Sequence, residues 1–441
     1  MQILHLSAKN FRCFVDFQVE LHSGFNLLIG GNGAGKTAVL DALKIGLGGF
    51  FQGFPGGKTY GFASTDMRLD PGPDQDGIPD MQPQAPTVLS WSGQLGGQKI
   101  KWHRKLQEQK RRTTKGGVAQ LRKRAEELAG KVRQHESVDL PVFAYFGTER
   151  LWLQKRHGPK LDRKRLSRNM GYLDCLERES SWIEMRNWFS AMTVGQDLAV
   201  KHGMTGARVA AELVKAVESA VCQCVPDTEA LFYWLGDLHL VRREQGRRVA
   251  LSWDMLSDGV RSLALIAAQI AWRAATLNPH RGDRAAIDAE GVVLIDEVCL
   301  GLHPKWQRLV IQSLTKAFPK IQFVATTHSP QVLGSAKDAR VILLQSGSAQ
   351  PLMGLYGKDT NTLVTVYQGG EERDSRVQAD LSAVEKLIDD DQVDQAQTRI
   401  ADVERLLGAD DPAIVRLRTL MRFLRPPKDG EAVYEVPHPP D

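Results

Sequence analysis

The stretch GGNGAGKT at residues 30–37 decides the fold of this chain of 441 residues. It fits the pattern G-x-x-x-x-G-K-[ST], with an apolar run at residues 24–30 before it and an Ala- and Leu-rich run at residues 37–47 after it. This order predicts a buried strand, a glycine-rich turn and a helix, in which backbone N–H groups wrap a phosphate. The helix N-terminus adds its partial positive charge. The stretch therefore predicts a phosphate-binding loop in an α/β fold.

The lysine and the threonine of this loop have the chemistry that a nucleoside triphosphate and its cation require. Lys36 is expected to reach the β and γ phosphates of ATP, and Thr37 is expected to offer its hydroxyl to Mg²⁺. A glycine turn that matches by chance is the alternative, which four fixed positions between a strand and a helix make rare. The predicted nucleotide-binding residues here are Gly30, Asn32, Gly33, Ala34, Gly35, Lys36 and Thr37.

A second apolar run ends in two adjacent carboxylates. Residues 292–295 read VVLI, and Asp296 and Glu297 follow directly. A short, fully apolar run is typical of a central parallel strand, and open parallel sheets bind ligands beyond the carboxyl ends of their strands. Asp296 is therefore predicted to hold Mg²⁺, and Glu297 is predicted to polarise the water that attacks ATP. A helix cap or a surface pair is the alternative interpretation.

A third apolar run, at residues 321–326, leads into the polar turn THSP. The predicted strand follows the carboxylate strand after a crossover helix at residues 304–317. His328 at its tip is predicted to hydrogen-bond the γ phosphate and to help orient the water. Taken alone, a histidine in such a turn is more often structural.

The segment LSDGVRS at residues 256–262 predicts a second anion site, because it combines a serine, a glycine and a helix start. A chain that already has a phosphate-binding loop has no obvious use for another. We therefore expect Ser257 and Gly259 to dock on the ATP held by a second copy, in a symmetric head-to-tail pair.

Composition restricts the class of protein further. Hydrophobic residues make up 42% of the chain, which suffices for a sizeable core, and no run reaches 18 apolar residues. The first residues lack the charged and apolar regions of a signal peptide, and five scattered cysteines do not suggest a disulfide framework. We expect a cytoplasmic protein that does not contact a membrane. The C-x-C at residues 222–224 is interpreted as two buried thiols.

Charge is unevenly distributed along the chain, although the net charge is only +5. Residues 101–170 hold 20 Lys and Arg against 7 Asp and Glu, whereas residues 371–441 hold 10 against 17. A basic segment in a near-neutral body predicts contact with a nucleic-acid backbone through residues 101–170, and a solvated helical arm is an equal alternative. The acidic tail is a candidate docking region for a partner, with a packing helix as the alternative.

Four regions are predicted from these patterns. Residues 1–100 form the first part of the ATP-binding head, residues 101–245 a basic helical insertion, residues 246–355 the second part of the head, and residues 356–441 a helical tail. Residues 88–106 resemble a β-hairpin with Gly96 and Gly97 at its turn. The overlapping residues 101–136 are charged and interrupted by two glycines, which predicts a short helical hairpin.

The motifs together carry a resemblance. GGNGAGKT, LSDGVRS, VVLIDE, CLGLHP and TTHSP resemble, over most of residues 1–345, the heads of ABC-type ATPases of the RecF/SMC class. NFRCF, YFGTERLW, LHPKWQ and FPKIQFVATTHSPQVL resemble the PtuA ATPases of Septu and retron-associated anti-phage systems. The resemblance implies an α/β fold: a mixed sheet with a parallel core, an antiparallel edge subdomain, a helical insertion and a helical C-terminal tail.

The resemblance also implies function. Such an ATPase hydrolyses ATP slowly with Mg²⁺, forms a homodimer or a larger assembly of dimers, and gates a separate HNH-type nuclease. In retron systems it works with a reverse transcriptase and its RNA and DNA product. We expect no nuclease activity from this chain alone, because its tail lacks the acidic strands of a Toprim-like domain. A RecF-like DNA repair ATPase is the first alternative, and a transporter ATPase fits the sequence less well.

Three positions stand out against the family pattern. The resemblance implies that Arg12 in NFRCF reaches a nucleotide phosphate, with an exposed surface arginine as the alternative. Cys299 and Gly301 stand where the family often has Asp and His, in the segment that crosses between protomers. We interpret Cys299 as a neutral replacement without a reactive role. The glutamine of the usual Q-loop is not evident near residues 145–150.

Overall fold

The computed structural model describes residues 1–71, 81–107, 116–151, 167–178, 181–203, 206–367 and 369–424. Contacts between residues divide the chain into a larger unit, Met1–Leu363, and a smaller unit, Val364–Asp441. Among the described residues, no helix is long and apolar enough to cross a membrane.

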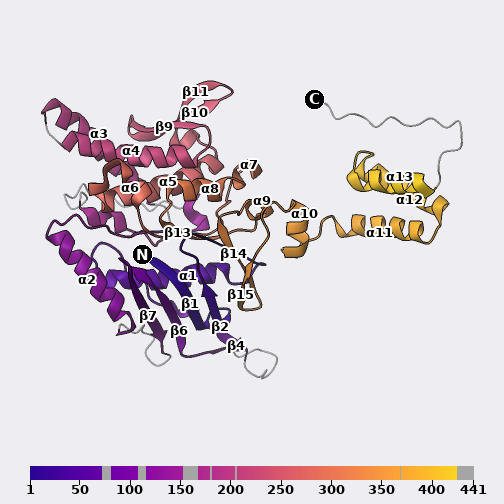
Figure 1. The fold of residues 1–441 in the computed structure, drawn as a ribbon, viewed down its shortest axis with the longest axis horizontal. Helices are drawn as coiled ribbons and strands as arrows, with labels where there is room; N and C mark the ends of the chain where they lie inside the picture. The colour runs from indigo at the N-terminus through magenta and orange to yellow at the C-terminus, as the bar shows by residue number, and fades with distance from the viewer. Residues whose placement is uncertain are drawn as a thin grey trace. The chain divides into compact units, whose positions relative to one another are not determined.

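A six-stranded mixed sheet forms the centre of the larger unit (Figure 1). Its order is β15 (Ser348–Leu352), β14 (Ala339–Gln345), β3 (Phe25–Ile29), β13 (Ile321–Thr326), β12 (Gly291–Ile295) and β8 (Val142–Phe146). All neighbouring pairs are parallel except β14 and β15. Every residue of β3, β8, β12 and β13 is buried, which explains why β8 and β12 read as unbroken apolar runs; the polar Asn26 of β3 and Gln322 of β13 are buried too.

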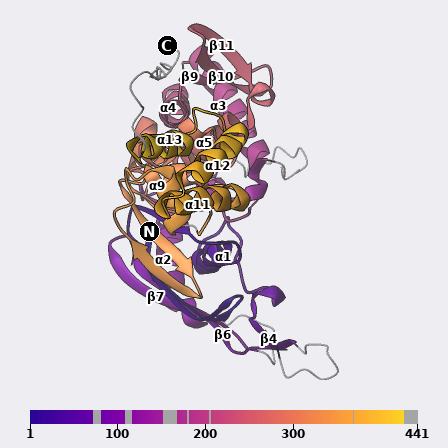
Figure 2. The ribbon, with the colours of Figure 1, turned by 90° about the vertical axis from the view of Figure 1, so that its right-hand side faces the viewer.

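A second, antiparallel sheet lies on one side of the central sheet, with helix α1 (Lys36–Leu47) beside it (Figures 1 and 2). Its order is β2 (Phe14–Glu20), β1 (Gln2–Phe11), β6 (Thr87–Leu95) and β7 (Gln98–Leu106). The predicted hairpin at residues 88–106 is confirmed, since Gly96 and Gly97 turn between β6 and β7 with φ of 56° and 75°.

Helices cover the opposite side of the central sheet (Figure 1). Helix α5 (Asp258–Leu277) is buried along most of its length, and helix α4 (Gly206–Cys224) packs on it. Helix α8 (Val310–Ala317) lies in the predicted crossover between β12 and β13. Other helices of this unit among the described residues include α3 (Trp182–Lys201), α6 (Ala285–Asp288), α7 (Pro304–Gln307), α9 (Pro330–Gly334) and α10 (Thr360–Thr362).

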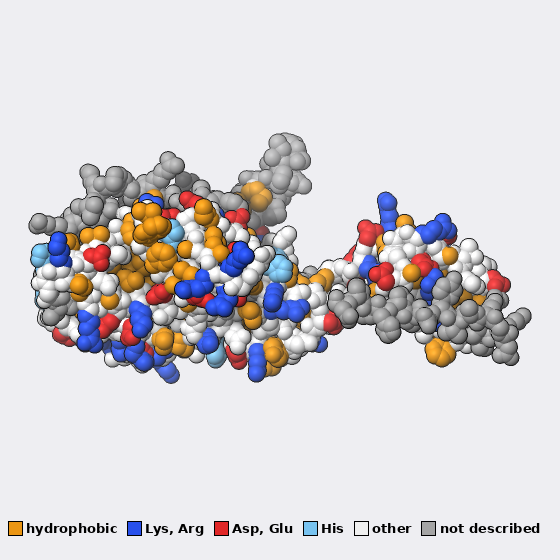
Figure 3. All heavy atoms as spheres, turned by 90° about the horizontal axis from the view of Figure 1, so that it is seen from above, with side chains coloured by type: hydrophobic (Ala, Val, Ile, Leu, Met, Phe, Trp, Pro, Cys, Tyr) orange, Lys and Arg blue, Asp and Glu red, His pale blue; other side chains and the backbone are white. Residues whose placement is uncertain are grey.

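A third sheet stands beyond α4, in the order β11 (Arg247–Ser252), β10 (Asp237–Glu244) and β9 (Thr228–Trp234). Figure 3 looks onto the side where this sheet lies in Figure 1 and shows hydrophobic side chains gathered beside Lys and Arg side chains. Trp234 and Leu235, at the turn between β9 and β10, are 57% and 80% exposed.

The predicted helical hairpin at residues 101–136 is wrong. Residues up to Leu106 belong to β7, in which apolar and charged side chains alternate as a strand requires. Helix α2 (Ala119–Arg133) is the one α-helix among the described residues of this segment. Leu121 and Ala125 of α2 are buried, close to Gly49 and Gly53, so the helix packs on the head. Ten of the 20 Lys and Arg in residues 101–170 lie outside the described residues.

The smaller unit consists of three described helices, α11 (Ser375–Asp389), α12 (Val393–Leu407) and α13 (Pro412–Leu424). Gly408 ends α12 with a φ of 90°, and Pro412 begins α13. The helices share one core, formed by Leu381, Val384, Ile400, Val403, Ile414 and Leu417. The predicted fold class is therefore confirmed: an α/β head with a mixed sheet and an antiparallel subdomain, followed by a helical C-terminal region.

Candidate nucleotide-binding site

The glycine-rich turn joins the buried strand β3 to α1, which begins at Lys36. Gly30 and Gly35 have φ of 147° and 94°. A Cβ on Gly30 would lie 2.4 Å from the carbonyl oxygen of Leu344, and a Cβ on Gly35 would lie 2.8 Å from Cys13 Sγ. Both positions therefore need glycine for conformation and for space.

The Lys36 ammonium lies over this turn. Its Nζ donates to the carbonyl oxygens of Gly30 and Gly31 at 2.9 Å and 3.0 Å. Burial lowers the pKa of Lys36, and the attraction of Glu297 and Asp296 opposes that effect. The lysine thus lies between the turn and the two carboxylates that the sequence assigned to the same site.

Thr37 and Asp296, the two predicted cation ligands, are in direct contact. Thr37 Oγ1 donates to Asp296 Oδ2 at 3.0 Å, and Thr326 Oγ1 donates to Asp296 Oδ1 at 2.7 Å. A hydroxyl and a carboxylate are the hard oxygen donors that Mg²⁺ prefers, and Mg²⁺ commonly takes its other ligands from phosphates and water. These residues therefore fit the cation, although the described residues include no cluster of three His, Cys, Asp or Glu side chains.

Glu297 and His328 also lie together. His328 Nε2 is 3.4 Å from Glu297 Oε1, and the Glu297 N–H donates to Thr326 Oγ1 at 2.8 Å. The φ of Glu297 is 49°, in the left-handed region that residues with a Cβ seldom adopt. The turn after β12 and the turn after β13 thus bring the predicted base and the predicted histidine side by side.

Cys299 lies against the same glutamate. Its Sγ is 3.8 Å from Glu297 Oε2 and 3.2 Å from Thr327 Oγ1, and burial raises the pKa of the thiol. The sequence assigned Cys299 to a contact between protomers and did not predict its position beside Glu297.

Arg150 is a buried residue of the site that the sequence did not identify. Its side chain is 2% exposed, and its guanidinium donates to the carbonyl oxygens of Asp296 and Glu297, each at 2.7 Å. Burial lowers the pKa of Arg150 to about 10. The signal was available in YFGTERLW, where an arginine follows a buried strand, but nothing local shows that this strand lies next to the carboxylate strand.

Arg12 lies beside α1, held by two carboxylates. Its Nε donates to Asp66 Oδ1 at 2.8 Å, and its Nη1 donates to Asp41 Oδ2 at 2.7 Å. Asp41 also accepts hydrogen bonds from Arg178 and Tyr145. Arg12 is thus anchored to α1 at Asp41, one helical turn after Thr37.

Ser257 and Gly259 lie at the start of α5, as the sequence predicts for a second anion site. Ser257 is exposed, and its hydroxyl makes no capping hydrogen bond. A Cβ on Gly259 would lie 2.5 Å from the carbonyl oxygen of Gly301, so this glycine packs on the segment that follows Glu297. Among the described residues, no hydrogen bond links Ser257 or Gly259 to the glycine-rich turn of the same chain.

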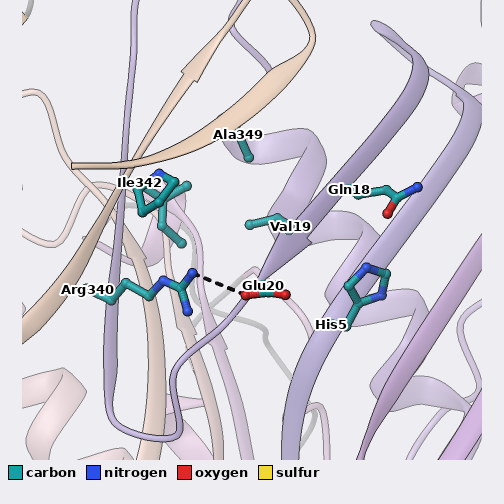
Figure 4. A pocket seen from close by; sticks show the side chains of 8 residues that line it. His5, Gln18, Val19, Glu20, Arg340, Ile342 and Ala349 are labelled. Carbon is teal, nitrogen blue, oxygen red and sulfur yellow. Dashed lines mark hydrogen bonds and ion pairs between the residues drawn. The ribbon is translucent and has the colours of Figure 1, made fainter.

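A surface pocket elsewhere in the head contains none of these residues. It lies between β2 and the β14–β15 hairpin (Figure 4), where Arg340 Nη2 is 3.5 Å from Glu20 Oε2. Its lining consists of His5, Gln18, Val19, Glu20, Arg340, Ile342, Ala349 and Pro351. The residues that the motifs predict as a site therefore gather at the carboxyl end of the central sheet, outside this pocket.

Comparisons with known proteins agree with the motifs. A retron Ec83 probable ATPase of Escherichia coli is 37% identical over 139 residues, which cover 32% of this chain and 25% of that protein. A retron Vc95 probable ATPase of Vibrio cholerae serotype O1 biovar El Tor is 33% identical over 121 residues, which cover 26% of this chain and 23% of that protein. A Septu protein PtuA of Bacillus mycoides is 43% identical over 89 residues, which cover 20% of this chain and 12% of that protein. The matches thus span a quarter or less of these relatives' own lengths.

A crystal structure of an SMC head bound to the C-winged helix domain of ScpA has a TM-score of 0.49 and 12% identity, covering 80% of this chain and 98% of that one. A family model described as an AAA domain matches residues 5–184. A second, described as an AAA domain, putative AbiEii toxin, Type IV TA system, matches residues 112–334, just over half of the chain. The chain therefore belongs to this second family, and its motifs resemble those of ABC-type ATPases of the RecF/SMC class.

Proposed function

We propose that this chain is the Mg²⁺-dependent ATPase subunit of a bacterial anti-phage complex, in which its ATP cycle gates a separate HNH-type nuclease. The observation that carries the ATPase mechanism is the meeting of four predicted residues at the end of the central sheet. Thr37 contacts Asp296, and Glu297 faces His328, although they come from three separate parts of the sequence.

Each of these residues has a distinct part in hydrolysis. Lys36 and the glycine-rich turn hold the β and γ phosphates, and Thr37 and Asp296 hold Mg²⁺, which offsets phosphate charge when bound. Glu297 accepts the proton of the attacking water, and His328, within contact distance of Glu297, orients that water against the γ phosphate. Turnover is slow, so that the ATP-bound state lasts long enough to act as a signal.

The active assembly is a head-to-tail homodimer, alone or within a larger assembly. The start of α5 offers an uncapped serine hydroxyl and the N–H groups of a first helical turn, which suit the γ phosphate of ATP held by a second copy. Ser257 and Gly259 of one copy thus complete the site of the other. Arg12, next to Asp41 on α1, is proposed to contact a nucleotide phosphate.

The partners are proposed from the relatives. Proteins named as retron ATPases and as Septu PtuA share segments with this chain, which supports membership in a defence complex. The cytoplasmic location and the HNH-type nuclease as partner are proposed from the resemblance of the motifs. In a retron setting, a reverse transcriptase and its RNA and DNA product join it. Residues 101–170 are proposed to contact nucleic acid, and the helical tail, residues 356–441, is proposed to dock the nuclease. This chain alone is not expected to cut nucleic acid.

The substitution Glu297→Gln tests the mechanism. We expect ATP turnover to fall by about 10²- to 10⁴-fold, because the general base is lost, while ATP still binds. The variant should form a stable dimer with ATP and Mg²⁺, measured by light scattering. Glu290→Gln is the matched control, because Glu290 precedes β12 at its other end and its side chain is 65% exposed. A Glu297→Gln protein that stays monomeric with saturating ATP and Mg²⁺ would contradict the shared site.

The nuclease assignment has its own test. A neighbouring gene for an HNH-type nuclease, whose product copurifies with this chain and cuts DNA only in an ATP-dependent manner, is the expected result. Neighbouring recombination genes and stimulation of DNA repair would instead favour the RecF-like alternative.

A further inference from the structure

We infer that Arg150 is a positioning residue for hydrolysis, which holds the backbone of Asp296 and Glu297 in place and joins it to helix α5. The inference rests on the proposed function, because it matters only if Glu297 activates the attacking water. It adds a residue to which none of the sequence motifs assigned a role.

Arg150 makes four hydrogen bonds to three parts of the fold. Its Nη1 donates to the carbonyl oxygens of Asp296 at 2.7 Å and Gly147 at 2.9 Å, and its Nη2 donates to that of Glu297 at 2.7 Å. Its Nε donates to Ser262 Oγ on α5 at 3.2 Å. The planar guanidinium, which has five N–H donors in a fixed arrangement, thus fixes the turn after β12 against the turn after β8.

The turn after β12 needs this support because Glu297 has a left-handed backbone conformation. A φ of 49° is unfavourable for a residue with a Cβ and persists only where neighbours hold it. The Glu297 N–H is held by Thr326 Oγ1 and its carbonyl oxygen by Arg150. Both peptide groups around the Cα are therefore fixed, which fixes the direction of the Glu297 side chain toward His328.

The charge of Arg150 acts at the same place. Burial lowers its pKa only to about 10, so the guanidinium keeps its charge at neutral pH. The charge strengthens the hydrogen bonds to the carbonyl oxygens of Asp296 and Glu297, because a charged donor bonds more strongly than a neutral one.

The bond to Ser262 links Glu297 to the proposed second anion site. Ser262 is 1% exposed and lies on α5, close to Gly259 at its start, and Gly259 in turn packs on Gly301. If α5 moves when its start binds the ATP held by a second copy, Arg150 and Gly301 therefore pass that movement on to Glu297. Arg150 thereby couples the two ATP sites of the dimer.

Arg150→Ala and Arg150→Lys test the inference. We expect kcat for ATP to fall about 10- to 100-fold, as for other groups that orient catalytic residues, with KM changed much less. Guanidinium chloride at low millimolar concentration should partly restore kcat in Arg150→Ala. Ser262→Ala removes one of the four hydrogen bonds of Arg150 and should lower kcat a few-fold in a folded protein. This variant tests the inference even if Arg150→Ala does not fold.

The matched control is Arg273→Ala. Arg273 is 1% exposed and donates to the carbonyl oxygens of Gly171 and Leu173 and to Ser181 Oγ, the same kinds of partner, away from Glu297. Arg273→Ala should lower thermal stability but not kcat, and guanidinium should not change its kcat. Folded Arg150 and Ser262 variants with the kcat of the parent, or equal guanidinium effects in Arg150→Ala and Arg273→Ala, would overturn the inference. A parent protein without ATP turnover would instead overturn the proposed function.

Discussion

Thr37 Oγ1 donates a hydrogen bond to Asp296 Oδ2 at 3.0 Å, across 259 residues of sequence. The hydrogen bond joins the start of α1 to the end of β12, so the proposed cation ligands come from two separate motifs. Because β12 and most of α1 are buried, the two oxygen atoms are held on rigid elements.

Thr37→Val should remove the hydroxyl at nearly constant side-chain volume. We expect the rate of Mg²⁺-dependent ATP hydrolysis to fall by roughly 10- to 100-fold, since a hydrogen bond to a charged group contributes about 1.5–3 kcal/mol. Thr315→Val is the control, because Thr315 Oγ1 donates only to Ile311 within α8. Equal rates for Thr37→Val and the parent protein would exclude Thr37 as a cation ligand.

ATP affinity should fall as the pH rises. The fall should begin at a lower pH than it would for a lysine with its ordinary pKa. Lys36 must be protonated to attract phosphates, and burial lowers its pKa from the ordinary 10.5, against the attraction of Glu297 and Asp296. Titration with a fluorescent ATP analogue between about pH 7 and about pH 10 measures this, and Lys36→Ala should bind weakly throughout. A parent affinity that stays constant across this range would contradict the prediction.

Gly259→Ala should reduce both ATP turnover and ATP-dependent dimer formation. The new Cβ would lie 2.5 Å from the carbonyl oxygen of Gly301, so the start of α5 or the segment after Glu297 must move. Gly130→Ala is the control: a Cβ there meets nothing within 4 Å in α2, and the change should stabilise the fold by about 0.5–1 kcal/mol. Calorimetry and light scattering distinguish the two variants; parent-like dimerisation of Gly259→Ala would count against the second anion site.

Charge reversal on α2 should weaken nucleic-acid binding. Lys123, Lys131 and Arg133 are exposed, and replacing all three with Glu should reduce the slope of log K against log salt by about one for each phosphate that these side chains neutralise in the parent protein. Arg405→Glu on α12 is the control, with a side chain that is 78% exposed. If the salt dependence is unchanged, the described part of the basic segment is a solvated surface.

Leu417→Ala should destabilise the helical unit at the C-terminal end by about 2–5 kcal/mol, because the side chain is fully buried in its core. ATP turnover should be retained, since the contacts group this unit separately from the head. Leu420→Ala on the same helix is the control, because Leu420 is 43% exposed. Chemical denaturation measures this, and we expect two transitions, one of which shifts to lower denaturant concentration in Leu417→Ala. Loss of ATP turnover in this variant would show that the two units depend on each other.

The sequence predicted most of the central sheet because its strands are buried on both faces. Such strands read as apolar runs, as at β12. The polar residues within them, Asn26 in β3 and Gln322 in β13, are buried and donate hydrogen bonds to backbone carbonyl oxygens. The sequence was less successful where charge and strand pattern coincide. Residues 101–106 fell in two overlapping predictions, a β-hairpin and, because of their charges, a helical hairpin. The structure has the strand, in which Trp102 and Leu106 are buried at alternate positions of β7.

Local patterns could place Asp296, Glu297 and the glycine-rich turn at the ends of strands, because polar residues after apolar runs are visible within a few positions. They could not show which strands are neighbours. Arg150 acts on Glu297 only because β8 pairs with β12, and Cys299 contacts Glu297 only because the chain turns sharply after β12. Strand order depends on contacts between distant segments, so only the tertiary structure decided which side chains surround the carboxylates that the sequence had already identified.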